Sequence, residues 1–327
     1  MFFSASLLSF ALLASTVFAV PTSRLDGDIS RRVGRLVSPF RPADGVSEKL
    51  LSARKNGGSG GGNGGNSGGG GGSGGNTSKT ATVTATRTTS TATTATSSPP
   101  SSTDPAVLTS SIWAGAGMES PANTYKSVTG TLVVPHLQPA AGGASTGFYG
   151  GSAWVGLDGM TCQTSLMATG IDFIYFNETI TANTWTEVYP NPGVDLSMSV
   201  NAGDTIKLTV TATSTTTGTA VVENLSNGQS STVSLTSPSP LCLENAEWIV
   251  EDFQESTFLI PFADFGSITF TDASATTQSG STVGPDASDS HIINMAQKDA
   301  ELQVLQFTSA SCTANSVTVD YLTSIPF

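Results

Sequence analysis

The chain has 327 residues and a formal net charge of −12, which is distributed unevenly along it. Up to residue 106 it carries ten basic and five acidic residues, whereas residues 107–327 carry three basic and twenty acidic ones. A region this acidic is a poor ligand for nucleic acids and for anionic membranes, so we expect neither as a partner.

Residues 1–19 are typical of a secretory signal peptide. An apolar run from Phe2 to Val17 leads into Val17-Phe18-Ala19, which has the small-x-small pattern of a signal-peptidase site. No later stretch reaches the roughly 18 apolar residues that a membrane span needs. We therefore expect a soluble protein that is secreted to the extracellular space.

Residues 20–56 form a basic segment with two dibasic steps, Arg31-Arg32 and Arg54-Lys55. In a secreted precursor such steps are typical sites of processing proteases, so we interpret 20–56 as a pro-segment; a solvated basic tail is the alternative. A basic segment ahead of an acidic domain has the charge to dock over an acidic cleft and inhibit it.

Residues 57–106 have the composition of a disordered linker. Residues 57–75 are almost entirely Gly, Ser and Asn, and residues 77–103 are rich in Thr and Ser, as in O-glycosylated stalks. Neither part has enough apolar residues to order itself. The folded unit is therefore expected to be a single domain, residues 107–327, which is long enough to bury a sizeable core.

Within 107–327 the apolar residues follow a period of two, and turn signals separate the runs. This pattern predicts an all-β fold, a sandwich or a barrel, because many short strands recur at close spacing. The predicted strands are 127–134, 152–157, 164–176, 183–189, 205–212, 218–224, 230–236, 246–253, 267–271, 291–296, 302–308 and 315–322.

The cysteines and glycosylation motifs fit an exported protein. Cys162 and Cys242 lie in or just before the two stretches that carry the candidate site, so we predict a disulfide between them and a buried thiol at Cys312. Their spacing matches no zinc site. The N-glycosylation sequons begin at Asn76, Asn177 and Asn224, and we expect all three to be glycosylated.

Several catalytic classes lack their residues in this domain. Its two histidines, His136 and His291, stand beside no recognisable nucleophile motif, and no G-x-S-x-G elbow is present. No Asp-Thr/Ser-Gly pair supports an aspartic protease. The glycine runs lie in the linker, where they cannot form a phosphate-binding turn between strand and helix. We predict no metal and no cofactor.

Carboxylates on predicted strands are the remaining candidates. In Glu247-Trp-Ile-Val-Glu251 the strand period places both glutamates on one face, which is either solvated or the lining of a cleft. Glu187 offers another carboxylate beside aromatic residues. A carboxylate pair would also suit a glycoside hydrolase, so a carbohydrate-active sandwich that uses Glu187 and Glu251 is one alternative.

Several segments, in the same order along the chain, resemble the signature segments of the glutamic peptidases, the eqolisin family. The main ones are Trp113-Ala-Gly-Ala, Trp154-Val-Gly-Leu-Asp-Gly, Cys162-Gln-Thr and Asn245-Ala-Glu-Trp-Ile-Val-Glu-Asp-Phe253. The resemblance implies a concanavalin A-like sandwich of two antiparallel sheets. It also implies a secreted, acid-active endopeptidase that is made as a pro-protein and acts on proteins or peptides. We expect a monomer.

The resemblance implies a site as well. Glu251 stands at the position of the catalytic glutamate, which activates water and later protonates the leaving amine. The family's second catalytic residue is a glutamine whose amide orients this water and stabilises the oxyanion, and here Ala168 occupies its position. Gln163 matches a different, non-catalytic glutamine. The positions that line the site correspond to Trp154, Asp158, Glu187 and Tyr189.

Ala168 opens a second alternative. Losing one oxyanion donor typically slows an enzyme by about 10²–10³. The sequence is therefore consistent with two interpretations: an endopeptidase with weakened activity, and a catalytically inactive family member that binds peptides or polymers.

Overall fold

The computed structural model describes residues 105–255, 258–298 and 303–326. This part of the chain is built from strands, and it contains no helix long and apolar enough to cross a membrane. The all-β class predicted from the sequence is confirmed. The expected signal peptide, pro-segment and linker, with Asn76, lie outside the described residues.

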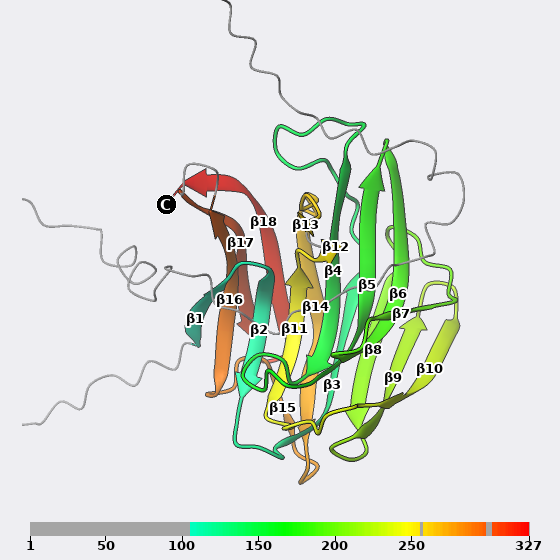
Figure 1. The fold of residues 1–327 in the computed structure, drawn as a ribbon, viewed down its shortest axis with the longest axis vertical. Helices are drawn as coiled ribbons and strands as arrows, with labels where there is room; N and C mark the ends of the chain where they lie inside the picture. The colour runs from blue at the N-terminus through cyan, green and yellow to red at the C-terminus, as the bar shows by residue number, and fades with distance from the viewer. Residues whose placement is uncertain (1–104, 256–257, 299–302, 327) are drawn as a thin grey trace, which may run out of the picture.

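All described strands except β12 (Gln254–Glu255) and β13 (Phe258–Leu259) form one continuous sheet that folds into two facing layers (Figure 1). The front layer runs in the order β16 (Ser290–Lys298), β2 (Trp113–Glu119), β11 (Asn245–Glu251), β4 (Phe148–Leu157), β5 (Leu166–Phe176), β6 (Thr179–Tyr189) and β7 (Val194–Leu196). The back layer runs in the order β10 (Gln229–Thr236), β9 (Thr217–Asn224), β8 (Thr205–Ala212), β3 (Tyr125–Val133) and β14 (Ser267–Thr277).

The layers are joined along one side. There β18 (Ser316–Pro326) pairs with β14, and β17 (Val304–Thr313) links β18 to β16. Neighbouring strands are antiparallel except that β1 (Ala106–Ser110) runs parallel to β16. The short β15 (Thr282–Val283) extends β14, and β12 (Gln254–Glu255) pairs with β13 (Phe258–Leu259).

The two layers bury their strands differently. In β8 and β9 buried residues alternate with partly exposed ones, as expected for a sheet with one solvated face. Strand β11 is buried at every position and β4 at all but its first. The front layer therefore has a second covered face besides the one that forms the core with the back layer. Trp248 of β11 points into that core, where its indole N–H donates to the carbonyl of Thr129, 2.8 Å away.

Each predicted strand occurs, and the structure adds several that the sequence did not indicate. Strand β8 has its predicted bounds, whereas β14 extends six residues past its predicted end. Strand β2 was missed because its sequence, Trp-Ala-Gly-Ala-Gly-Met-Glu, shows no alternation. Six of its seven residues are buried, so both faces of the strand are apolar or small.

One predicted glycosylation site, Asn224, is less exposed than the sequence led us to expect, and the third cysteine, Cys312, is more exposed. Asn224 was expected to be a glycan acceptor, but it ends β9 with only 1% of its surface exposed. Cys312 of β17 is a free thiol that is half-buried rather than fully buried. Its partial burial raises the pKa of the thiol to about 11, so it stays protonated and unreactive at neutral pH.

Gly115 permits β2 to approach β11 closely. It has a φ of 142°, and a β-carbon at this position would lie 2.0 Å from the backbone oxygen of Trp248. We predict that Gly115→Ala destabilises the domain by about 3 kcal/mol or more, because both the backbone conformation and the strand contact are lost. Ala116→Gly only removes a buried methyl group from the same strand and should cost about 1–2 kcal/mol. Urea unfolding of both variants measures the difference, and equal losses would contradict this account.

Candidate active site

The candidate residues lie on the face of the front layer that points away from the back layer, which we call the site face. On β11 this face carries Glu247, Ile249 and Glu251, since Trp248 and Val250 pack into the inter-layer core. Residues directly opposite each other in paired strands share a face. The register of β2, β11, β4, β5 and β6 therefore identifies the remaining site-face residues.

Three rows of site-face residues cross these five strands. The first row is Trp113, Glu251, Ser152, Asp172 and Asn183. The second row is Gly115, Ile249, Trp154, Gly170 and Trp185. The third row is Gly117, Glu247, Gly156, Ala168 and Glu187. Adjacent rows are two residues apart along each strand, or about 6–7 Å.

The side chain of Glu251 is held in place beside tryptophan rings, and we call Trp113, Trp154 and Trp185 the aromatic wall. Its side chain is 1% exposed, and its Oε2 accepts a hydrogen bond from the indole N–H of Trp154 at 2.8 Å. The ring of Trp154 meets that of Trp113 edge to face, with centroids 5.1 Å apart. A charge-assisted hydrogen bond of this kind fixes the orientation of the carboxylate. Trp154, predicted to line the site, is thus in direct contact with the predicted base.

Glycine allows the tryptophans to pack over the sheet. A β-carbon at Gly170 would lie 2.5 Å from Cβ of Trp154 and 2.8 Å from Cζ2 of Trp185. These rings belong to a hydrophobic cluster that is separate from the inter-layer core. Its buried members are Ile112, Trp113, Trp154, Met160, Leu166, Ala168, Trp185, Ile249 and Ile293. The site face is therefore a second apolar core into which acidic groups are set.

Ala168 is a member of this cluster and is 1% exposed. It stands directly opposite Gly156 on one side and Glu187 on the other. Relative to Glu251 it is two strands across and two rows along the same face. The position of the missing glutamine therefore faces the same way as Glu251, but its methyl group cannot donate a hydrogen bond. Gln163 does not replace it, since it is exposed in the loop before β5.

Glu187 and Tyr189 also lie on the site face. Glu187 is 2% exposed, and Tyr189 stands opposite Leu166 and packs against the apolar cluster. Glu187 is three strands from Glu251, about 14 Å across the sheet, and two rows along it. The two carboxyls of a glycosidase lie about 5–9.5 Å apart. The register places the backbones of the two residues far apart, and the carbohydrate-active alternative stays a prediction.

Asp158 makes structural contacts that the sequence did not predict. It follows β4 with a φ of 65° and is fully buried, and its carboxylate accepts the backbone N–H groups of Leu243, Glu244 and Asn245 at 2.8–3.3 Å. Its oxygens are thus occupied by the segment that leads into β11. These hydrogen bonds anchor the segment, and the role of Asp158 in lining the site stays a prediction.

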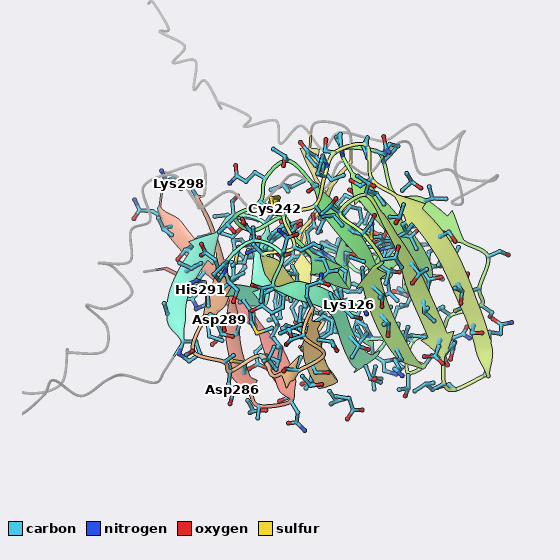
Figure 2. All side chains as sticks on the ribbon, turned by 90° about the horizontal axis from the view of Figure 1, so that it is seen from below. Lys126, Cys242, Asp286, Asp289, His291 and Lys298 are labelled. Atoms are coloured by element: carbon cyan, nitrogen blue, oxygen red, sulfur yellow. A yellow bond between two sulfur atoms is a disulfide. The ribbon has the colours of Figure 1, made fainter. Side chains whose placement is uncertain are left out.

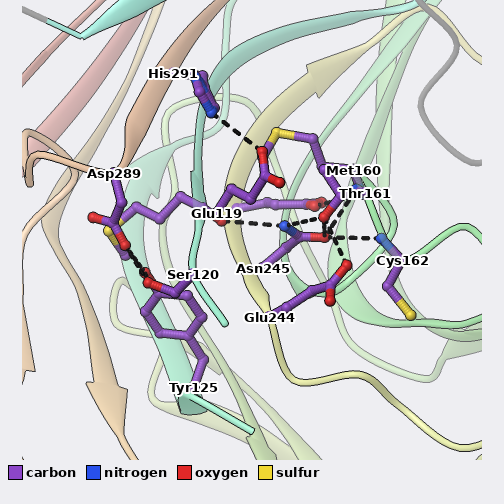
Figure 3. Close-up of polar contacts among 12 residues, drawn as sticks. Glu119, Ser120, Tyr125, Met160, Thr161, Cys162, Glu244, Asn245, Asp289 and His291 are labelled. Atoms are coloured by element: carbon purple, nitrogen blue, oxygen red, sulfur yellow. Dashed lines mark hydrogen bonds and ion pairs between the residues drawn. The ribbon is translucent and has the colours of Figure 1, made fainter. Parts of the chain in front are cut away.

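A disulfide and an amide network fasten the same corner. Cys162 and Cys242, the pair predicted from the sequence, are joined with a Cα–Cα distance of 6.0 Å. The side-chain oxygen of Asn245 accepts the backbone N–H groups of Thr161 and Cys162 at 2.9 and 3.3 Å (Figure 3). Together these contacts fix the loop between β4 and β5 against the start of β11. Asp158 lies close to the two sulfurs, but the disulfide removes the thiolates that a metal would need.

Glu247 is a buried acid in the third row of the site face. It is fully buried, and its Oε1 accepts the backbone N–H of Met160 at 2.9 Å, while Oε2 has no hydrogen-bond partner. Burial raises the pKa of Glu247 well above its ordinary value, and the nearby Asp158 adds to the effect. Burial likewise raises the pKa of Asp158. For Asp158 the backbone N–H groups of Leu243, Glu244 and Asn245 oppose this effect, because they favour the charged form.

Asp252, the residue after Glu251, is a second buried acid of this kind. Its Oδ2 accepts a hydrogen bond from the amide of Gln297 at 2.7 Å, and the same amide donates to the carbonyl of Ser111 at 2.8 Å. Burial raises the pKa of Asp252 to about 8, and the charge of Glu251 contributes. This contact ties the end of β11 to β16 and to the chain just before Trp113.

The rows contain residues that the sequence did not single out for the site. Ser152 and Asp172 share the row of Glu251, and the hydroxyl of Ser152 donates to Asp172 at 2.7 Å. Trp113 and Trp185 complete the aromatic wall. Counting alternate positions along each predicted strand would have found Asp172 and Trp185. No such count could find Trp113, because β2 shows no strand pattern.

Comparisons with known proteins agree with this geometry. The family model described as Peptidase A4 family matches residues 111–321. Aspergillopepsin-2 of Aspergillus niger is 42% identical over 231 residues, which cover 65% of this chain and 78% of that protein. Scytalidopepsin B of Scytalidium lignicola is 39% identical over 210 residues, which cover 61% of this chain and 76% of that protein.

A solved structure of scytalido-glutamic peptidase with a transition state analog inhibitor superposes with a TM-score of 0.55 at 34% identity. The match covers 65% of this chain and 98% of that one. A complex of an eqolisin-family peptidase with the tripeptide Ala-Ile-His superposes with a TM-score of 0.51, also at 34% identity. Fold and site thus define a peptide hydrolase of the glutamic type. The chain belongs to the peptidase A4 family, as its resemblance to the eqolisins indicated.

Because the buried acids have raised pKa values, we predict that the free energy of unfolding falls as the pH rises. An unfolded glutamate ionises above about pH 4.5, whereas folded Glu247 resists ionisation because its pKa is raised. The free energy of unfolding therefore declines from about pH 4.5 up to the folded pKa. Glu247→Gln keeps the bond to Met160 without a charge, so we expect it to be about 1–3 kcal/mol more stable than wild type at pH 7 and similar at pH 3.

Urea unfolding at the two pH values measures this effect. Glu178→Gln, the same exchange on an exposed turn, is the matched control and should follow wild type. If Glu247→Gln loses stability equally at pH 3 and pH 7, the charge of Glu247 is not what limits stability at neutral pH.

Proposed function

We propose that this protein is a secreted, extracellular endopeptidase that hydrolyses peptide bonds of proteins at acidic pH, with Glu251 as the base. The observation that carries the proposal is the setting of Glu251, which is buried on the site face with its Oε2 2.8 Å from the indole nitrogen of Trp154. A carboxylate that is held in one orientation inside an apolar wall is suited to take a proton from water.

In the proposed reaction Glu251 first accepts a proton and later donates it. Glu251 takes a proton from water as the oxygen attacks the carbonyl carbon of the peptide, which forms a tetrahedral intermediate with a negative oxygen. Protonated Glu251 then gives the proton to the amine nitrogen as the C–N bond breaks. The site face supplies Glu251 and the hydrogen bond from Trp154 that keeps it in place. No metal or cofactor enters these steps.

The side chain at position 168 limits the rate in this scheme. An amide there would orient the water and donate a hydrogen bond to the oxyanion, and Ala168 does neither. The expected result is a slow enzyme, since a missing oxyanion donor costs about 10²–10³ in rate, or about 3–4 kcal/mol. The buried Ala168 also supports the alternative, in which the protein binds peptides or polymers without cleaving them.

Restoring the amide tests this proposal. We predict that Ala168→Gln cleaves acid-denatured protein at least about 100-fold faster than wild type, and that Glu251→Gln abolishes cleavage in either background. Peptide release at acidic pH gives the rates. Ala314→Gln adds the same side chain at an exposed turn and should leave the rate unchanged. If wild type already cleaves as fast as Ala168→Gln, Ala168 does not limit the rate.

The binding alternative predicts a different outcome. Wild type would then show no cleavage that depends on Glu251, yet calorimetry would detect binding of a peptide at acidic pH. Titration of the inactive Glu251→Gln variant with the same peptide separates binding from turnover. Absence of both cleavage and binding would refute the peptidase proposal and the alternative together.

The pro-segment is proposed as an inhibitor of the mature domain. The domain's charge favours this: Lys126 and Lys298 lie far apart (Figure 2), and Lys207, which is partly exposed, is paired with Glu223 at 3.6 Å. A basic segment would therefore meet little repulsion at an acidic site. We predict that a synthetic peptide of residues 20–56 inhibits the domain and that salt weakens the inhibition. A peptide with Gln in place of its Arg and Lys residues is the control, and equal inhibition by both would exclude an electrostatic mechanism.

A further inference from the structure

Two of the three N-glycosylation sequons lie in described residues, Asn177-Glu-Thr179 and Asn224-Leu-Ser226. They are equivalent as sequence motifs, because both offer an asparagine two residues before a hydroxyl residue. A glycan replaces one of the two hydrogens on the side-chain nitrogen, Nδ2, and needs solvent space around it. The two asparagines differ in exposure: the fold leaves one at the surface and encloses the other.

Asn177 is presented to solvent. It forms, with Glu178, the two-residue turn between β5 and β6, where Phe176 pairs with Thr179. Both turn residues have positive φ, 48° and 65°, which asparagine tolerates better than most residues. Asn177, Glu178 and Thr179 are all exposed. This turn is the hairpin that joins β5 to β6 in Figure 1.

Asn224 is enclosed, and its amide is fully used. Nδ2 donates to the carbonyl of Ser199 at 3.0 Å and to Oδ2 of Asp204 at 2.9 Å. Its Oδ1 accepts the backbone N–H groups of Ser226 and Asn227 at 3.0 and 3.3 Å, within the turn that follows β9. With 1% of the residue exposed, a sugar on Nδ2 has no room, and it would break at least one of the two donated bonds.

We propose that Asn177 is an N-glycan attachment site and that Asn224 stays unmodified in the folded protein. The donor is a lipid-linked oligosaccharide pyrophosphate. Nδ2 of Asn177 forms a bond to C1 of the first sugar and loses one proton, while the bond from C1 to the phosphate oxygen breaks and the lipid pyrophosphate leaves. Nothing is oxidised or reduced. A chain glycosylated at Asn224 could not close the turn after β9, so such molecules are absent from the folded pool.

The test is site-resolved mass spectrometry of the full chain, directed into the secretory pathway of a yeast and collected from the medium. Enzymatic removal of N-glycans in ¹⁸O-water converts each modified asparagine to a labelled aspartate. We expect the label at Asn177 in most molecules and none at Asn224. Thr179→Ala keeps Asn177 but removes the sequon, so it should abolish the label at 177. Asn224→Gln should leave the glycan mass unchanged.

Two results would overturn the proposal. The first is label at Asn224 in secreted protein that unfolds cooperatively in urea, because the fold then tolerates a glycan where the amide is enclosed. The second is secreted protein without label at Asn177. Neither result depends on catalysis, so the test stands apart from the peptidase proposal.

Discussion

The structure depends on how one strand buries its carboxyl groups. Strand β11 is buried along its whole length, and yet it carries Glu247 and Glu251, with Asp252 directly after them. A carboxylate buried without partners is costly, so each group is accommodated in its own way. Glu247 and Asp252 have raised pKa values and one hydrogen-bond donor each, from Met160 and Gln297. Glu251 instead receives the indole N–H of Trp154 on the site face. Glu247 and Asp252 thus fasten the strand to Met160 and Gln297, and Glu251 is the group to which the proposed mechanism assigns the chemistry.

The same constraint explains where sequence reasoning succeeded. Period-two patterns found β8 and β9 of the back layer to within one residue, because each of these strands has one solvated face. Glu251 and Trp154 were assigned through family motifs, and the register brings them together. Strand β2 was missed because burial on both faces removes the alternation on which such a prediction relies. Trp113 begins one of the family segments, but no periodicity placed it on the site face opposite Glu251.

Asp158 shows a different limit. Residue type and motif position predicted an acidic side chain that lines the site, and the carboxylate is present, but its oxygens accept backbone N–H groups of residues 243–245. Which partner a carboxylate finds depends on segments distant in sequence, here the approach to β11, 85 or more residues away. Sequence can thus indicate that an acid matters without separating an anchoring role from a binding role. Asn224 carries the same lesson, since a sequon records residue types and not the enclosure of its amide.

Ala168 is best understood through its neighbours. It sits in an apolar cluster opposite Gly156, and the ring of Trp154 covers that glycine, 2.9 Å from where a β-carbon would be. A methyl group at 168 completes this packing without a buried polar atom, whereas an amide there would need hydrogen-bond partners in an apolar setting. The carboxyl of Glu187, directly opposite Ala168, is one such partner, and in the proposed mechanism the substrate carbonyl and the attacking water are others. In the proposed mechanism, an amide at this position would therefore lower the stability of the empty site and raise the catalytic rate. Alanine avoids burying that amide, so the chain keeps the fold of the peptidase A4 family while the proposed catalytic centre lacks the amide donor.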